Sequence, residues 1–391
     1  MRHRTSSSWF VVGAAGLLSL MACAADAPKA PAWVAGMKNP PPGGASFAGA
    51  NFWNIDWQGQ QDYFRRDVDF SRETNPWLPE LLADVRPYRV LRFMDWNDAN
   101  AAQTIQAHFE TRKSKTAAQN QPVALEWQID LCNRTDKDCW ITVHHTSTAA
   151  DWRQMAELVK ASLKPSLRLY LEWSNEVWNG GAPQHAFAEN AAKEQGLRSE
   201  NPAAAYQVHA SVRMFEEFAR AFAGQQHRLV KVLAGQGAWT GPCEAQADAL
   251  ADGAINPQRT LPDVYAIAPY ISGKSVDELR KSIAEARKWT ESHVKCAGRI
   301  GVPLISYEGG SDSFALAGKC KDLQHEAGMR QLYIEYLESQ AAAGLRGPFM
   351  QYTHSGQCWG LKEKTGDPPE SSPKYQGLME WLRRVDPPQV Q

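Results

Sequence analysis

Short apolar segments of strand length alternate along this chain with longer segments whose apolar residues recur at helical spacing. The strand-like segments are residues 46–52, 88–96, 140–145, 169–176, 228–233, 264–270, 302–308 and 347–352. The helix-like segments are residues 123–131, 151–163, 203–223, 276–286, 329–337 and 375–384. Such alternation is typical of repeated strand–helix units around a parallel sheet. About eight units cover the chain after its first residues, so we expect one α/β domain without internal repeats.

The segment 169–180, LYLEWSNEVWNG, carries the first candidate for chemistry. Alternation places Glu172 and Glu176 on the face opposite the leucines. Glu176 ends the apolar run and has Trp173 and Trp178 nearby in sequence. A carboxylate there is a poor packing choice, but it can transfer a proton to a sugar oxygen. Alternatively, Glu176 caps the following helix or pairs with an arginine.

A second segment repeats this design. Residues 302–310, VPLISYEGG, form an apolar run that ends in Glu308 before two glycines. Two carboxylates at the ends of parallel strands are what cleavage of a glycosidic bond requires. One acts as an acid on the leaving oxygen, and the other acts as nucleophile or base.

Trp173-Ser174-Asn175-Glu176 together with Tyr307-Glu308 resembles the strand-four and strand-seven signatures of the clan A glycoside hydrolases. That superfamily consists of (β/α)8 barrels and includes cellulases, β-mannanases and β-xylosidases. The resemblance implies a single TIM barrel in which Glu176 is the acid/base, Asn175 holds the sugar 2-hydroxyl and Glu308 is the nucleophile. It further implies hydrolysis of a β-linked polysaccharide or oligosaccharide with retention, without a metal or organic cofactor.

The resemblance also suggests polar residues around these glutamates. Arg92 matches an arginine near the end of strand two, close to the nucleophile; alternatively, it forms a buried ion pair with Asp95. His145 matches a histidine at the end of strand three, and no third ligand is apparent for a metal. Tyr270 matches a tyrosine that bonds the nucleophile, although Ala268 stands where many members have histidine.

Aromatic residues are candidates for stacking against sugar rings. The chain has 15 tryptophans, most of which we expect in the core. Trp96 is expected to face the cleft after strand two, and Trp178 to lie beside Glu176. At the end of strand eight, Tyr352, His354 and Trp359 compete for the place under a bound sugar, and Trp359 is our candidate.

Charge and length limit the possible functions. The 391 residues include 42 basic and 43 acidic residues, for a net charge of −1. This balance gives no excess of positive charge that would favour binding to nucleic acid or to an anionic membrane. We expect a monomer. Three alternatives to a retaining hydrolase remain: a catalytically silent carbohydrate-binding barrel, an inverting hydrolase, and a structural lipoprotein of the envelope.

The first residues have the pattern of an export signal. A basic start is followed by an apolar stretch at residues 9–22, and Leu20-Met21-Ala22-Cys23 resembles a bacterial lipobox. We therefore expect a signal peptide at 1–23, an Ala/Pro-rich tether at 24–44 and the barrel at 45–391. Cys23 would carry a lipid anchor on an outer-membrane lipoprotein. Ordinary cleavage after Ala24 or Ala25, giving a periplasmic or secreted protein, is the alternative.

Six cysteines remain after Cys23, and an even number in an exported protein suggests disulfides. Six cysteines allow 15 connectivities. Because they lie in neighbouring loops, Cys320 and Cys358 are the first predicted pair. The second pair is Cys132 with Cys139, which flank a short polar turn. Cys243 with Cys296 follows only by elimination, because these two are expected near opposite ends of the barrel.

Overall fold

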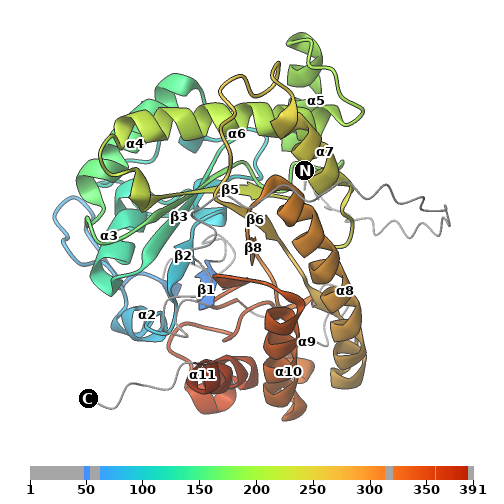
Figure 1. Ribbon diagram of the computed structural model, residues 1–391. Coiled ribbons are helices and arrows are strands. Elements are labelled where there is room, and N and C mark those ends of the chain that lie inside the picture. The colour runs from blue at the N-terminus through green and yellow to red at the C-terminus, as the bar shows by residue number, and fades with distance from the viewer. Residues whose placement is uncertain (1–47, 53–61, 313–319, 357, 386–391) are drawn as a thin grey trace, which may run out of the picture.

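A computed structural model describes residues 48–52, 62–312, 320–356 and 358–385 of the chain (Figure 1). Eight parallel strands close into a barrel in the order β1–β10–β8–β6–β5–β4–β3–β2. The strands are β1 (Ala48–Asn51), β2 (Val90–Arg92), β3 (Asp138–Val143), β4 (Leu169–Trp173), β5 (Leu229–Ala234), β6 (Val264–Ile267), β8 (Leu304–Ser306) and β10 (Phe349–Gln351). The predicted single (β/α)8 barrel is confirmed.

Helices surround this barrel (Figure 1). They are α2 (Pro79–Asp84), α3 (Leu125–Thr135), α4 (Ala149–Ser162), α5 (Pro183–Glu194), α6 (Pro202–Ala221), α7 (Gly241–Ala251), α8 (Val276–Ile300), α9 (Cys320–His325), α10 (Gly328–Ala343) and α11 (Pro373–Val385). All six helix-like segments of the sequence correspond to helices here. The periodicity did not predict the helices α2, α5, α7 and α9.

Two apolar layers hold the barrel together, one inside the sheet and one between the sheet and the helices. Tyr170 belongs to the inner cluster, where it stacks on Trp140 with 5.4 Å between ring centroids. Leu169, Leu171 and Trp173 belong to the outer cluster. The alternation expected along β4 is therefore confirmed, and it turns Glu172 towards the barrel interior.

A small parallel pair of strands fixes the backbone beyond two of the candidate site residues. β7 (Ile271–Ser272) follows Tyr270, and β9 (Ser311–Asp312) follows Glu308 by two glycines. On α10, the Tyr336 hydroxyl donates to the carbonyl oxygen of the residue before Tyr270, at 2.7 Å, and accepts from the amide of Gly310 at 3.1 Å. These bonds hold together the chain segments that carry Tyr270 and Glu308.

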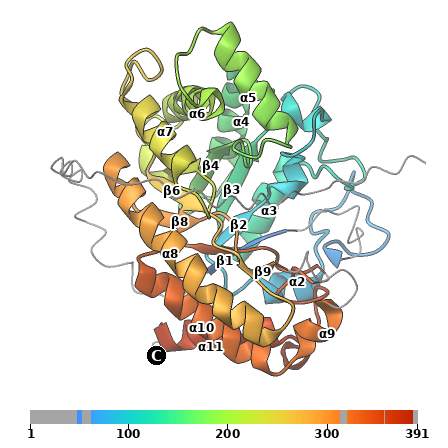
Figure 2. The same cartoon turned by 90° about the vertical axis from the view of Figure 1, so that its right-hand side faces the viewer.

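The position of the long helix α8 explains the disulfide between Cys243 and Cys296, which was the last of the three predicted pairs. It spans 25 residues, and Figure 2 shows its carboxyl-terminal end beside α7. Arg299 pairs with Asp248 of α7 at 3.2 Å, and Cys243 is bonded to Cys296. The expectation that these cysteines lie near opposite ends of the barrel was wrong, because α7 packs against the last turns of α8.

The other two predicted pairs have different outcomes. Cys132 and Cys139 are free buried thiols, so the predicted bridge between them is wrong. The Cys132 thiol points instead to the carbonyl oxygen of Asp138, at 3.9 Å. Cys358 is disulfide-bonded, but the side chain of Cys320 lies outside the described part of the structure. The pair Cys320–Cys358 therefore stays a prediction.

The expected signal peptide, Cys23 and the tether lie outside the described residues, so export and lipidation stay predictions. Within residues 48–52, 62–312, 320–356 and 358–385, no helix has the length and apolar character needed to cross a membrane. In the same ranges, no group of three or more His, Cys, Asp or Glu side chains is arranged to hold a metal ion.

Candidate active site

Arg92 is the centre of the polar cluster at the carboxyl ends of the strands. Its side chain is 0% exposed, and each guanidinium nitrogen is bonded. Nη1 donates to Oε1 of Glu308 at 2.8 Å and to Oδ1 of Asn51 at 2.9 Å. Nη2 donates to Oδ1 of Asn175 at 2.8 Å and to Oε2 of Glu172 at 2.9 Å. The predicted position of Arg92 beside the nucleophile candidate is thus observed, and the alternative pair with Asp95 is not formed.

Glu172 provides the buried counter-charge for Arg92. Its Oε2 also accepts from Nε of Arg92 at 3.1 Å, from Nε1 of Trp140 at 2.9 Å and from Oγ1 of Thr142 at 3.1 Å. Burial lowers the pKa of Arg92, but the charges of Glu172 and Glu308 outweigh this effect and raise it. Arg92 therefore remains a cation and fixes the oxygen atoms around it.

Glu308 lies just beyond the end of β8 and is 5% exposed. Both of its oxygens accept hydrogen bonds: Oε1 from Arg92, and Oε2 from the Tyr270 hydroxyl at 3.0 Å. The expected contact between Tyr270 and Glu308 is therefore present. A cation and a phenol together hold this carboxylate in one orientation.

Glu176 lies beyond the end of β4 and is half-buried. The backbone has positive φ angles at Ser174 (60°) and Glu176 (47°). Residues other than glycine seldom adopt this left-handed conformation. Such strain occurs preferentially at functional sites. The Tyr307 hydroxyl donates to Oε1 of Glu176 at 3.1 Å. Because Tyr307 directly precedes Glu308, the two candidate glutamates share one site.

Burial raises the pKa of both glutamates. For Glu176, hydrogen bonds from Tyr307 and Asn179 oppose this rise. For Glu308, the pKa is raised to about 8 because burial and the charge of Glu176 exceed the lowering by Arg92. The charge of each carboxyl group therefore affects the titration of the other.

Asn175 is buried between the Arg92 cluster and the first turn of α5. Its Oδ1 accepts from Arg92, and its Nδ2 donates to Oδ1 of Asn100 at 3.1 Å. Gln184 of α5 donates to the carbonyl oxygen of Asn175 at 2.6 Å. The side chain is therefore fixed next to Glu176.

Two of the three candidate tryptophans contact the tyrosines of this cluster. Trp178 packs against Tyr307 with 5.8 Å between ring centroids. Trp359 contacts the rings of Tyr270 and Tyr352 edge-on, at 5.7 and 5.8 Å. Both indoles are half-buried, so each has some surface available to a ligand.

The structure places two other candidates apart from the glutamates. Trp96 is 0% exposed and stacks among aromatic core residues, with its ring centroid 5.0 Å from that of Phe52. It therefore has no exposed surface for a sugar. His145 is buried against His144 and Phe187, at 4.0 and 5.1 Å. His354, a competitor of Trp359, is fully buried as well.

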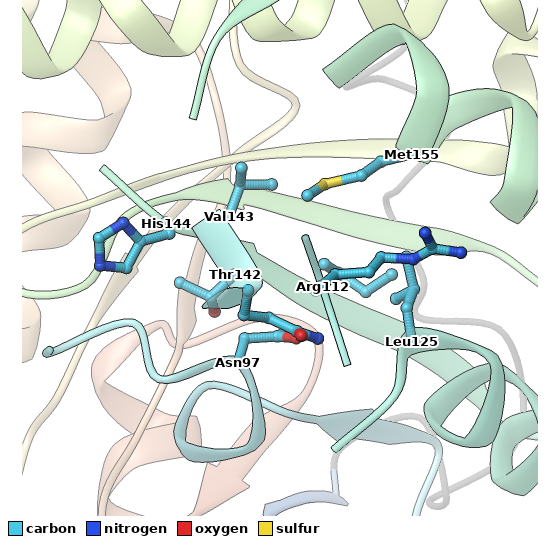
Figure 3. Close-up of a pocket in the computed structure, with 9 residues that line it drawn as sticks. Asn97, Arg112, Leu125, Thr142, Val143, His144 and Met155 are labelled. Atoms are coloured by element: carbon cyan, nitrogen blue, oxygen red, sulfur yellow. The ribbon is translucent and has the colours of Figure 1, made fainter. Parts of the chain in front are cut away.

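A separate small pocket lies between β3 and the helices α3 and α4. Figure 3 shows Asn97, Arg112 and Met155 around it, with Thr142 at its edge. Neither Glu176 nor Glu308 lines this pocket. Leu125, Ile141, Val143 and Met155 of its lining belong to the outer apolar cluster, so we assign the pocket no part in the site.

No protein-family model and no curated protein sequence matches the chain. Solved structures do match it. The GH51 arabinofuranosidase from Xanthomonas axonopodis pv. citri has 13% sequence identity and a TM-score of 0.54, with 88% of this chain and 74% of that chain covered. A 4-O-α-L-rhamnosyl-β-D-glucuronidase from Fusarium oxysporum 12S has 16% sequence identity and a TM-score of 0.53, with 86% of this chain and 69% of that chain covered. The chain has the fold of glycoside hydrolases. At these identities the likeness concerns the fold alone.

Sequence reasoning missed several members of the cluster. Asn51, Glu172 and Tyr307 all contact Arg92 or Glu176, and Asn100 orients Asn175. Three of the four could have been found: Asn51 lies near the end of a strand-like segment, Glu172 lies on the same strand face as Glu176, and Tyr307 belongs to the second motif. Asn100 lies in a loop, where no pattern in the sequence indicates a partner.

Proposed function

We propose that the protein is a retaining glycoside hydrolase that cleaves β-linked polysaccharide or oligosaccharide, with Glu176 as acid/base and Glu308 as nucleophile. One observation carries the proposal: carboxylates from the ends of β4 and β8 meet in one buried polar site through Tyr307. This arrangement supports membership of the clan A superfamily, which the motifs suggested.

The different surroundings of the two glutamates support their roles. Glu308 accepts hydrogen bonds from Arg92 and Tyr270 on separate oxygens, which favours its anion and orients it for attack. Glu176 accepts from the neutral phenol of Tyr307, and no ion pair is formed with it among the described residues. We therefore assign the acid's proton to Glu176 and the anionic form to Glu308 at the start of the reaction.

In the proposed reaction, Glu308 attacks the anomeric carbon while Glu176 protonates the leaving glycosidic oxygen. The covalent glycosyl–enzyme ester is then hydrolysed by a water molecule that gives its proton to Glu176. Asn175, fixed by Arg92 and Asn100, lies beside Glu176 in position to bind a sugar hydroxyl.

The test uses two variants and a substrate with a good leaving group, such as a dinitrophenyl β-glycoside, after a screen of β-glycans and aryl glycosides. We expect Glu308→Ala to lose nearly all activity on every substrate. Glu176→Ala should retain more activity on the activated substrate, which needs little acid assistance. Added azide should accelerate Glu176→Ala and give a β-glycosyl azide, while wild-type hydrolysis should release the β-anomer first, as followed by NMR.

Other outcomes would point elsewhere. Release of the α-anomer by the wild-type protein would identify an inverting enzyme. An inverted α-glycosyl azide from Glu176→Ala together with a retained β-glycosyl azide from Glu308→Ala would mean that the two roles are exchanged. Binding of glycans without any hydrolysis would identify a catalytically silent carbohydrate-binding barrel.

A further inference from the structure

A third carboxyl group, that of Asp95, lies at the site beside the two glutamates. Asp95 begins the short helix η4 (Asp95–Asn97) beyond β2 and is half-buried. The Tyr352 hydroxyl donates to its Oδ2 at 3.2 Å. Within the described part of the chain, its Oδ1 makes no hydrogen bond, so this oxygen is available to a ligand.

Ring contacts connect Asp95 to the surroundings of Glu308. Tyr352 contacts Trp359 edge-on at 5.8 Å, and Trp359 contacts Tyr270 at 5.7 Å. Tyr270 in turn donates to Oε2 of Glu308 at 3.0 Å. A carboxyl group, aromatic surface and the proposed nucleophile thus line one continuous wall. Such a combination suits a sugar, whose hydroxyls need acceptors and whose C–H faces need apolar contact.

The strand order places this wall at the same ring of strand ends as both glutamates. Asp95 follows β2 and Tyr352 follows β10, so their hydrogen bond spans the end of β1. Next to β10 lies β8 with Glu308, and next to β2 lies β3, which separates Asp95 from β4 and Glu176. Asp95 is also near enough for its charge to act on Glu308, so it can contact a sugar bound at the two glutamates.

The groups of this wall that can become negatively charged near neutral pH are the carboxyl groups of Asp95 and Glu308. Arg92 is the cation next to Glu308, and its Nε, Nη1 and Nη2 are all bonded within the protein. It is therefore not free to receive a carboxylate from a substrate. A uronic acid at this position would meet the carboxyl groups of Asp95 and Glu308, and among the described residues Arg92 is the one cation that pairs with either of them. Sugar hydroxyls, by contrast, would find acceptors.

Building on the proposed function, we propose that Asp95, held by Tyr352, is a specificity residue that selects an uncharged sugar over a uronic acid in the subsite next to Glu308. Its carboxylate accepts hydrogen bonds from the hydroxyls of the bound sugar. The same carboxylate repels the negative charge of a uronic acid.

The charges that face Asp95 also predict how this selection depends on pH. The pKa of Asp95 is raised to about 7, because burial outweighs the lowering by Tyr352 and Arg92, and Asp98 adds to the rise. Glu308 faces Asp95 as well, since the charge of Asp95 raises the pKa of Glu308. Asp95 is therefore mainly neutral below pH 7 and charged above it, so discrimination against a uronic acid should grow as the pH rises through about 7.

The experiment compares matched substrates that differ only in C6. These are the nitrophenyl β-glucoside and β-glucuronide, the corresponding galacto pair, and the preferred hexose glycan before and after oxidation at C6. The wild-type protein should prefer the neutral member by about tenfold or more in kcat/KM. Asp95→Asn keeps the size and polarity of the side chain but removes its charge. It should lower this preference about tenfold and abolish its change near pH 7.

Two further variants complete the test. Tyr352→Phe keeps the ring beside Trp359 but removes the hydrogen bond to Asp95, and it should raise KM for the neutral substrate several-fold while the protein stays folded. Asp248→Asn, on the surface of α7, is the matched control. It should change neither the preference for the neutral substrate nor the KM. If Asp95→Asn does not fold, the wild-type protein still tests the role of Asp95: its preference for the neutral substrate should increase as the pH rises through about 7.

An equal preference in wild type and Asp95→Asn, or a wild-type preference for the uronide, would overturn the role of Asp95 while leaving hydrolysis established. If the wild-type protein cleaves no β-glycan and no aryl glycoside, the proposed function fails, and the selection by Asp95 fails with it.

Discussion

The Tyr307 hydroxyl donates a hydrogen bond to Oε1 of Glu176 at 3.1 Å from the position directly before Glu308. The side chain of Tyr307 therefore orients one proposed catalytic carboxyl group while its backbone leads to the other. Its ring also lies 5.2 Å from the Arg92 guanidinium and 5.8 Å from the Trp178 ring. The hydrogen bond from Tyr307 thus helps to fix the orientation of the Glu176 carboxyl group.

Replacing this tyrosine with phenylalanine tests the relationship. Tyr307→Phe keeps the ring contacts with Arg92 and Trp178 but removes the hydrogen bond, which lowers the pKa of Glu176. Without it the pKa of Glu176 rises, so the basic limb of the kcat/KM profile should move to higher pH. We expect kcat to fall roughly tenfold or more, since positioned acid catalysis contributes about 10²–10⁴-fold.

Tyr206→Phe, on α6, is the control and should leave the profile unchanged. A lower kcat with an unshifted basic limb would show that Tyr307 acts on packing alone. The activated aryl glycoside adds a second check, because its hydrolysis should suffer less in Tyr307→Phe than that of a glycan.

A second prediction concerns the stability of the cluster at Arg92. Glu172→Gln keeps the shape of the side chain but removes the charge that faces Arg92 in a fully buried pair. Removing one partner of a buried ion pair costs about 3–5 kcal/mol in unfolding free energy when the other charge is left uncompensated. Because Arg92 keeps its pair with Glu308, we expect a loss near the lower end of this range. Urea unfolding measures the change.

Glu291→Gln removes one partner of an exposed i,i+4 pair with Arg287 and is the control, with an expected change of about 0.5 kcal/mol or less. If both variants unfold at the wild-type urea concentration, then Glu172 does not stabilise the charge of Arg92.

Much of the fold could be predicted because its strands and helices have different hydrophobic periods. The strand of Leu169–Trp173 and the helix of Pro202–Ala221 lie where the pattern placed them. Strand ends were less predictable: the segment 88–96 contains only the three-residue strand Val90–Arg92, and a 3-10 helix then begins at Asp95. The turn into that helix moves Trp96 into the aromatic core, which alternation along a longer strand could not reveal.

Much of the candidate site could also be predicted, because strand ends in a parallel barrel meet at one face. Arg92, Tyr270 and Glu308 are brought together as expected. The partners that orient them depend on distances between strands remote in sequence. The bond from Arg92 to Glu172 joins β2 to β4, and no pattern within either strand indicates it.

His145 provides a prediction for the pH dependence of stability. Burial, with a smaller effect of His144, lowers the pKa of His145 to about 3. A free histidine has a pKa of about 6.5, so the unfolded chain binds this proton and the folded chain does not. The unfolding free energy should therefore fall as the pH is lowered from about 6.5 towards 3.

His145→Gln should make this fall less steep, by at most about 1.4 kcal/mol per pH unit. Urea unfolding at several pH values measures the slope. The exposed His227, replaced in the same way, is the control and should leave the slope unchanged. Equal slopes in wild type and His145→Gln would show that His145 is protonated in the folded protein.

The last prediction concerns the cysteines. The disulfide between Cys243 and Cys296 joins residues separated by 53 positions and ties α7 to the end of α8. On the chain-entropy model, a loop of this length stabilises the folded state by about 4 kcal/mol. The double variant Cys243→Ala/Cys296→Ala should therefore lose a free energy of that order in urea unfolding.

The buried thiols of Cys132 and Cys139 offer an internal comparison, because the structure leaves both unbridged. Iodoacetamide should label them only after unfolding, and non-reducing peptide mapping should recover the bridge between Cys243 and Cys296. The expected bridge between Cys320 and Cys358 would appear in the same map. A bridge between Cys132 and Cys139, or a free thiol at Cys243, would contradict the structure and would mean that α7 does not pack on α8 as described.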